Sequence, residues 1–115
     1  LPELGWKNMR ELLDDLMMAL TDLLQCGFAS CPPETAERLK RLGARCENTG
    51  LHTGGEGMKE IGELLEEQRH TQEKDPEPLT RAVCRMVRYV ELCREKMSLD
   101  LVEENWKNEE RGKAE

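Results

Sequence analysis

Apolar residues recur every three or four positions from the start of the chain. Trp6, Met9, Leu13 and Leu16 follow this spacing, which Leu20 and Leu23 continue. Such spacing places the apolar side chains on one face of an α-helix. The pattern predicts a first helix over residues 3–25, which Gly27 is placed to end in a left-handed conformation.

Two shorter helices are predicted next. After Cys31-Pro32-Pro33, an apolar face at Ala36, Leu39, Leu42 or Gly43, and Cys46 predicts a helix to about Asn48, ended by Gly50. Thr53-Gly54-Gly55-Glu56 has the form of a capping box, so we expect the third helix to begin there. Its inward residues are Met58, Ile61, Leu64 and Leu65, and a polar loop is expected over about 68–74.

The fourth predicted helix is the longest. Asp75-Pro76 supplies a cap and a first-turn proline, and an inward stripe follows at Leu79, Val83, Met86, Val90, Cys93 and Met97. After Met97 the apolar residues Leu99, Val102 and Trp106 occupy a different helix face. Ser98 and Asp100 could mark a kink or a new cap.

Two arrangements of the C-terminal segment are open. A bend at Ser98 would fold Leu99, Val102 and Trp106 onto Trp6 and Met9, whereas a straight helix would pass beyond the bundle. A helix from Pro76 to Trp106 is about 46 Å long, against about 34 Å for the first helix, which favours the straight arrangement. Exposed apolar residues on it would mark a partner site with Trp106 as anchor, so we expect 98–108 to bind another protein or a second copy.

All apolar repeats have a helical period and none alternates as in a strand. With 3% aromatic residues, the composition also favours helix over sheet. The sequence therefore predicts an all-α fold, an antiparallel bundle of about four helices with a long C-terminal helix. The bundle forms a single domain over residues 1–108, and 109–115 forms a charged, frayed tail.

The formal net charge of -7 disfavours bulk neutralisation of phosphate groups. Two local groups of basic residues at helical spacing nevertheless form a possible nucleic-acid face: Lys40, Arg41 and Arg45, and Arg81, Arg85 and Arg88. A solvated helix surface is the simpler interpretation of both groups. A nucleic-acid-associated accessory subunit is thus the alternative function.

Five cysteines and no apolar signal segment favour free thiols in a reducing, cytoplasmic compartment. Cys26, Cys31 and Cys46 with His52 are the best candidates for a zinc site, but their spacing fits no tight zinc knuckle, so buried or half-buried thiols are favoured. Cys31 near a helix N-terminus could have a lowered pKa and act as a nucleophile, yet no base has a recognisable active-site context. We expect no enzyme activity, no metal and no cofactor.

The segment 20–67 carries a turn at Gly27-Phe28-Ala29, a proline-led helix and a turn at Gly50-Leu51-His52. In this order the elements resemble the helical region that accompanies SWIM zinc fingers in some bacterial proteins. The Cys-x-Cys and Cys-x-His pairs of the finger itself are absent. The resemblance implies a helical accessory part, and it transfers no metal or nucleic-acid role to any residue here.

No 18-residue apolar run is present that would span a membrane. The sequence favours a non-enzymatic helical interaction module, or a small subunit of a larger complex. It does not identify the partner, the oligomeric state, the source or whether the chain is part of a longer protein.

Overall fold

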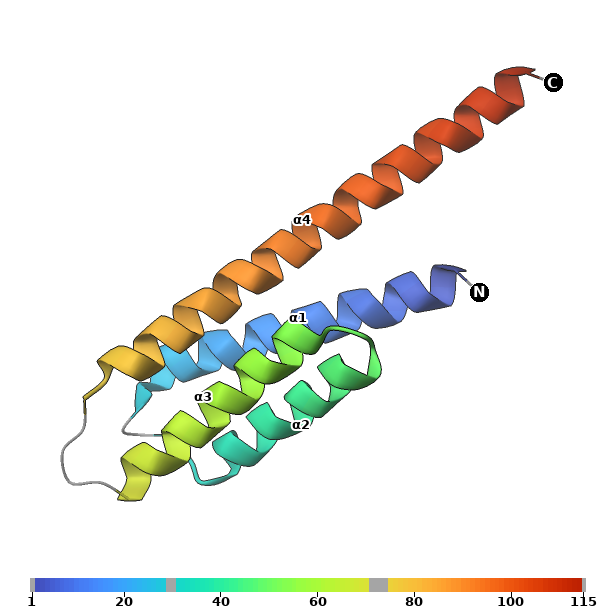
Figure 1. Ribbon diagram of the computed structural model, residues 1–115. Coiled ribbons are helices and arrows are strands. Elements are labelled where there is room, and N and C mark those ends of the chain that lie inside the picture. Colours follow the sequence, from blue (N-terminus) through green and yellow to red (C-terminus); the bar gives the residue numbers. More distant parts are fainter. Residues whose placement is uncertain (1, 29–30, 71–74, 115) are drawn as a thin grey trace.

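The computed structural model describes the backbone of residues 2–28, 31–70 and 75–114, and the side chains of 7–28, 31–70 and 75–110. It contains four helices: α1 (Pro2–Cys26), α2 (Glu34–Asn48), α3 (His52–His70) and α4 (Glu77–Ala114). Each helix runs antiparallel to the one before it, and α4 returns beside α1 to close the bundle (Figure 1). The described residues contain no strand, and the predicted all-α fold with a long C-terminal helix is confirmed.

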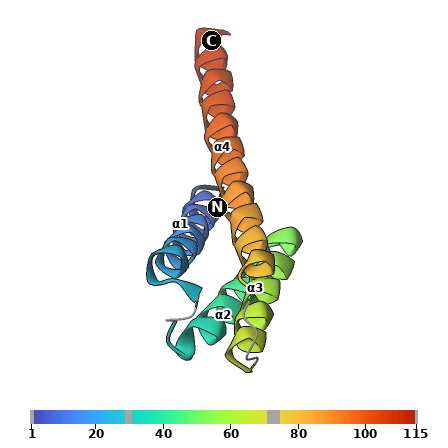
Figure 2. The same cartoon turned by 90° about the vertical axis from the view of Figure 1, so that its left-hand side faces the viewer.

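The core is built from the stripes that the sequence predicts. Figure 2 looks at the bundle from one side and shows the helices arranged around this core, with α1 and α3 on opposite sides. No buried polar or charged side chain occurs among the described residues. The largest fully buried side chains are Leu12, Leu13, Leu16, Leu20, Leu23, Leu39, Met58, Ile61, Leu79, Val83, Val90 and Cys46.

Glycines end α1 and α2 as predicted. Gly27 and Gly50 have φ angles of 76° and 90°, values that side chains with a Cβ rarely adopt. After α2 the amide of Leu51 donates to the carbonyl of Cys46 at 2.8 Å, and the amide of Gly50 donates to Glu47 at 3.1 Å. These two bonds form a Schellman motif, which reverses the chain within a few residues.

The predicted capping box at Thr53-Gly54-Gly55-Glu56 is wrong. α3 begins at His52, and the amide of Gly55 donates to the carbonyl of Leu51 at 2.9 Å, so Thr53 already lies inside the helix. The physical reason is the Schellman motif, because it places Leu51 immediately before α3, where its carbonyl accepts the first helical hydrogen bond. The helix thus begins about two residues earlier than the capping box predicts.

The α3 glycines allow close packing against the neighbouring helices. A Cβ at Gly43 of α2 would lie 3.1 Å from the carbonyl oxygen of Gly55, and a Cβ at Gly62 would lie 3.4 Å from that of Ala36. Gly57 similarly faces Met86 of α4, with no room for a Cβ beside its sulfur. Small residues thus set the short distance between the α2 and α3 backbones, which lie side by side in Figure 1.

The connection to α4 agrees with the predicted cap. The Asp75 carboxylate accepts a hydrogen bond from the amide of Glu77 at 3.1 Å, and α4 begins at Glu77, one residue after the predicted start. α3 extends to His70, further than expected, and the rest of the predicted polar loop, 71–74, lies outside the described residues.

Candidate protein-interaction surface

α4 is a single helix of 38 residues that extends beyond the rest of the bundle. Figure 1 shows its C-terminal part standing clear of α1, and the molecule measures 69 Å along its longest axis but 22 and 20 Å across. The helix passes without interruption through Ser98 and Asp100. The kink or fresh cap suggested there is therefore wrong, because an unbroken backbone hydrogen-bond ladder needs neither.

The α4 extension, residues 98–114, exposes the three apolar residues predicted as a partner site. Leu99, Val102 and Trp106 are 62%, 66% and 61% exposed. They do not fold back onto α1, where Met9 instead packs against the bundle core and the side chain of Trp6 lies outside the described part. The straight arrangement is the one observed. The extension includes residues 109–114 as helix where we expected a frayed tail, and the domain boundary at 108 stays a prediction.

Leu92 belongs with this exposed set, although it was not among the predicted partner-binding residues. It is 47% exposed and precedes Leu99 by seven residues, as Leu99 precedes Trp106. A seven-residue interval brings a helix back to nearly the same face, so the signal was present in the sequence. The heptad spacing was hidden because the residues of the core stripe alternate with it along the same stretch of sequence.

The predicted nucleic-acid face divides between two helices whose backbones do not adjoin, α2 and α4. Five of its six side chains form ion pairs with carboxylates: Lys40 with Glu66 at 2.7 Å, Arg45 with Asp15 at 2.8 Å, Arg85 with Glu60 at 3.2 Å, Arg88 with Glu91 at 3.8 Å, and Arg81 with Glu77. No ion pair is found for Arg41 within the described residues.

Three of these pairs join neighbouring helices, α2 to α3, α2 to α1 and α4 to α3. The hydrogen bond between Lys40 and Glu66 raises the pKa of the lysine and lowers that of the glutamate. Such a pair keeps both groups charged and neutralises their field. The structure thus supplies carboxylate partners for most of the basic side chains on both surfaces.

The four residues considered as candidates for a zinc site do not converge. Cys26 and Cys31 line a hollow of about 220 Å³ between α1 and α2, whereas Cys46 is fully buried beside Gly54 of α3. His52 pairs with Glu47 at 2.6 Å on the surface. Among the described residues no group of three or more His, Cys, Asp and Glu side chains is placed to hold a metal ion.

The lowered pKa that a helix N-terminus could give Cys31 is not found. Burial raises the pKa of this thiol, and the nearby Cys26 adds to the shift. The thiol also donates a hydrogen bond to the carbonyl of Gly27 at 3.1 Å, which holds its proton in place. Loss of solvent here outweighs the effect of the helix terminus.

The pKa values of a second thiol and of a phenol are strongly raised inside the bundle. Burial raises the pKa of Cys46 to about 11, and burial with a hydrogen bond to Cys93 raises the pKa of Tyr89 to about 12. Both groups are therefore neutral at ordinary pH. They act as packing groups where α2, α3 and α4 meet.

None of the helices in the described ranges is apolar enough over a sufficient length to cross a membrane.

Comparison with known proteins identifies the bundle. No curated protein and no solved structure gives a significant match to the chain. The family model of the YehQ four-helical bundle domain matches residues 4–87, which is more than half of the chain and ends within α4, before Leu92. The chain belongs to the YehQ four-helical bundle domain family.

Proposed function

We propose that this protein is a non-enzymatic helical interaction module, or a small subunit of a larger complex. Its α4 extension docks on another protein or on a second copy of the chain. The observation that carries the proposal is the continuation of α4 beyond the bundle with Leu99, Val102 and Trp106 exposed. Aromatic and aliphatic groups gathered on one projecting element are typical of a partner site.

The paired basic residues support this proposal over a nucleic-acid-associated accessory subunit. A phosphate backbone would have to compete with the carboxylates that already bind Lys40, Arg45 and Arg85. The net charge of -7 adds a general repulsion. Binding of this alternative type would weaken steeply with salt.

The state of the thiols supports a role without catalysis. The raised pKa of Cys31 leaves little thiolate at neutral pH, and Cys46 is sealed in the core. We propose that all five cysteines, which are free in this structure, stay reduced in a cytoplasmic compartment.

The resemblance to SWIM-associated helical regions gives a finer proposal, in which the chain is the helical part that accompanies such a finger. The glycines that carry the resemblance, Gly27 and Gly50, occupy left-handed turn positions. Sequencing the complete gene tests it: no Cys-x-Cys and Cys-x-His pairs in the same or an adjacent coding region would contradict it.

The interface is tested with a double variant, Val102→Ala with Trp106→Ala. Light scattering measures self-association, affinity capture from the native host measures partner binding, and a thermal melt reports folding. Lost association at an unchanged melting temperature supports the proposal. A large drop in melting temperature with association intact would show that both residues belong to the core of the fold.

A further inference from the structure

α4 carries two apolar stripes on opposite faces. The stripe that packs in the bundle contains Leu79, Val83, Met86 and Val90. At 100° per residue, the second stripe, Leu92, Leu99, Val102 and Trp106, is centred about 180° away from the first. The second stripe therefore faces away from the bundle. A partner can lie along it from the level of Leu92 outwards without displacing α1 or α3.

The spacing of this outer stripe indicates the shape of its partner. The intervals of seven, three and four residues between its members are those of the two seam positions in a coiled-coil heptad. Such a seam forms a narrow apolar stripe along the helix axis, and a second helix is the element that covers a stripe of this shape best. The described residues supply no such cover, because all four members are at least 47% exposed.

Charge distinguishes among helical partners. Five glutamates lie on the outer stripe or within about 65° of its centre: Glu91, Glu95, Glu103, Glu109 and Glu110. Only Glu91 and Glu103 have an ion pair among the described residues, with Arg88 at 3.8 Å and Lys107 at 3.3 Å. Between residues 91 and 110 no lysine or arginine lies within the same angle of about 65°, and Lys96 falls just outside it. Arg85 and Arg88 lie on the same face but precede Leu92, so from Leu92 outwards the stripe is framed mainly by carboxylates.

Glu95 decides between a second copy and a different partner. It falls on the seam itself, between Leu92 and Leu99, where a docked helix would bury it. A second copy would bring its own glutamates into the same seam, and buried like charges oppose association. A partner with lysine or arginine beside its apolar seam would pair with Glu95 and the flanking carboxylates instead.

We propose that the outer stripe of α4 binds a basic amphipathic helix of another protein, one with leucine-like residues at heptad spacing flanked by lysine and arginine. This inference rests on the proposed function, since it assigns the chemistry of the partner to the same surface. The match of the family model ends at residue 87, so the outer stripe lies beyond the matched domain.

The test uses two labelled synthetic helices of about four heptads. Both have leucine at the seam positions. The basic peptide has lysine and arginine at the flanking positions, and the acidic peptide has glutamate. Fluorescence anisotropy should show the basic peptide binding at least about tenfold tighter in about 50 mM salt, and weakening about fivefold by about 300 mM salt.

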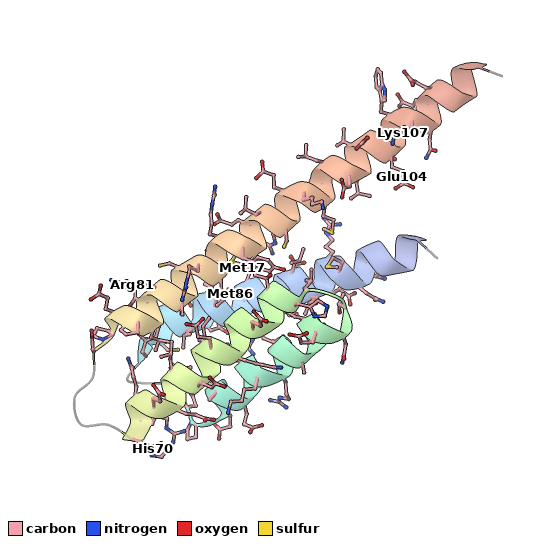
Figure 3. The ribbon with its side chains drawn as sticks, viewed as in Figure 1. Met17, His70, Arg81, Met86, Glu104 and Lys107 are labelled. Carbon is pink, nitrogen blue, oxygen red and sulfur yellow. The ribbon has the colours of Figure 1, made fainter. Side chains whose placement is uncertain are left out.

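Charge variants locate the binding face. Glu95→Lys with Glu103→Lys should reverse the preference, so that the acidic peptide binds better. The matched control, Asp100→Lys with Glu104→Lys, makes the same change in net charge away from the outer stripe. Figure 3 shows Glu104 on the lower side of α4. This control should keep the preference for the basic peptide, and an equal loss in both variants would mean diffuse attraction and overturn the inference.

Apolar variants separate this inference from the proposed function. The double variant Val102→Ala with Trp106→Ala should bind the basic peptide at least about tenfold more weakly, while its circular dichroism spectrum stays unchanged. Equal binding of both peptides, lost in this variant, would overturn the basic-helix inference and leave the interface standing. If the protein binds neither peptide but forms a dimer that depends on Trp106, the basic-helix inference is likewise overturned and the interface stands. Full binding of the basic peptide by the double variant would overturn the apolar interface itself.

Discussion

The two halves of α4 both carry apolar residues at helical spacing but have opposite surroundings. In the bundle half, residues 77–97, Leu79, Val83 and Val90 are fully buried against other helices. In the extension, Leu99, Val102 and Trp106 have no such neighbours. Figure 3 shows Met86 and Met17 where the helices come together, and Glu104 and Lys107 out on the free rod. One apolar stripe of α4 thus builds a core, and the other, on the opposite face, forms a surface.

The comparison shows that a helical stripe does not by itself reveal whether it is covered within the chain. Coverage depends on the helix face that a stripe occupies, since Leu92 is exposed although it belongs to the bundle half. It also depends on the length of the neighbouring helices, and α1 with 25 residues is shorter than α4 with 38. Residues of the bundle half contribute to folding stability through buried area. Residues of the extension are available for association.

The largest expected difference is between Leu79→Ala and Leu99→Ala, the same substitution in each half. Leu79 is completely buried, so its loss should lower the free energy of unfolding by about 2–5 kcal/mol, through lost burial and a cavity. Leu99→Ala should change it by less than about 0.5 kcal/mol. Denaturant unfolding of both variants measures the difference, and equal destabilisation would mean that the extension is covered within the fold.

The second prediction concerns pH and the bundle interior. Cys46 has a pKa of about 11 against an ordinary value of 9.0, so its neutral form stabilises the fold fully below pH 9. Above pH 9 the unfolded thiol loses its proton first, and stability should fall by about 2 kcal/mol as the pH approaches 11.

Cys46→Ala tests this dependence, because it should make the stability less sensitive to pH between 8 and 10, measured by denaturant unfolding. Cys84→Ala is the matched control, since that thiol is exposed on α4. Tyr89 adds its own loss only at higher pH, because its pKa rises from 10.0 to about 12. Identical pH profiles for both alanine variants would contradict the assignment.

The third prediction concerns the contact between the α2 and α3 backbones. Gly43→Ala should destabilise by about 1–2 kcal/mol although alanine is the better helix former, because the new methyl group meets the carbonyl of Gly55. Gly57→Ala should cost less, since the flexible side chain of Met86 can move aside. Thermal melts of both variants give the order, and stabilisation by Gly43→Ala would show that the helices can separate freely.

The smallest expected effect is at the boundary between the two halves of α4. Arg94 pairs with Asp14 of α1, and the two side chains are 40% and 54% exposed. A double-mutant cycle with Arg94→Ala and Asp14→Ala should give a coupling of less than about 1 kcal/mol, reduced further by salt. A larger, salt-insensitive coupling would mean that this pair, rather than apolar burial, fixes where the bundle ends.

The core could be predicted from sequence because burial in a helical bundle repeats with the helix period. Leu13, Leu39 and Val83 were identified in this way, as was the closing glycine Gly50. The start of α3 was placed at a capping box because Thr53 and Glu56 have that spacing, whereas the hydrogen bonds that make Leu51 the residue before the helix appear only in the structure. The direction of the Cys31 pKa shift could not be predicted from the sequence, because it depends on how deeply the folded chain buries the thiol. Leu99, Val102 and Trp106 were identified from the sequence as exposed residues. Their position opposite the core stripe, and the glutamates beside them, could be established only from the unbroken course of α4.

The connectivity of the bundle also determines the order in which its contacts can form. α2 and α3 are joined by the short Thr49-Gly50-Leu51 turn, and their backbones meet at Gly43 and Gly55, only twelve positions apart. The α1 to α4 contact instead closes a loop that includes both middle helices, such as the 80-position separation between Asp14 and Arg94. Chain closure costs more entropy over a longer loop, so we expect the α2–α3 hairpin to form early and the α1–α4 seam last. Kinetic φ-values near zero for residues of the α1–α4 contact, together with high values at Ala36 of the α2–α3 contact, would establish this sequence of events, and the reverse pattern would exclude it.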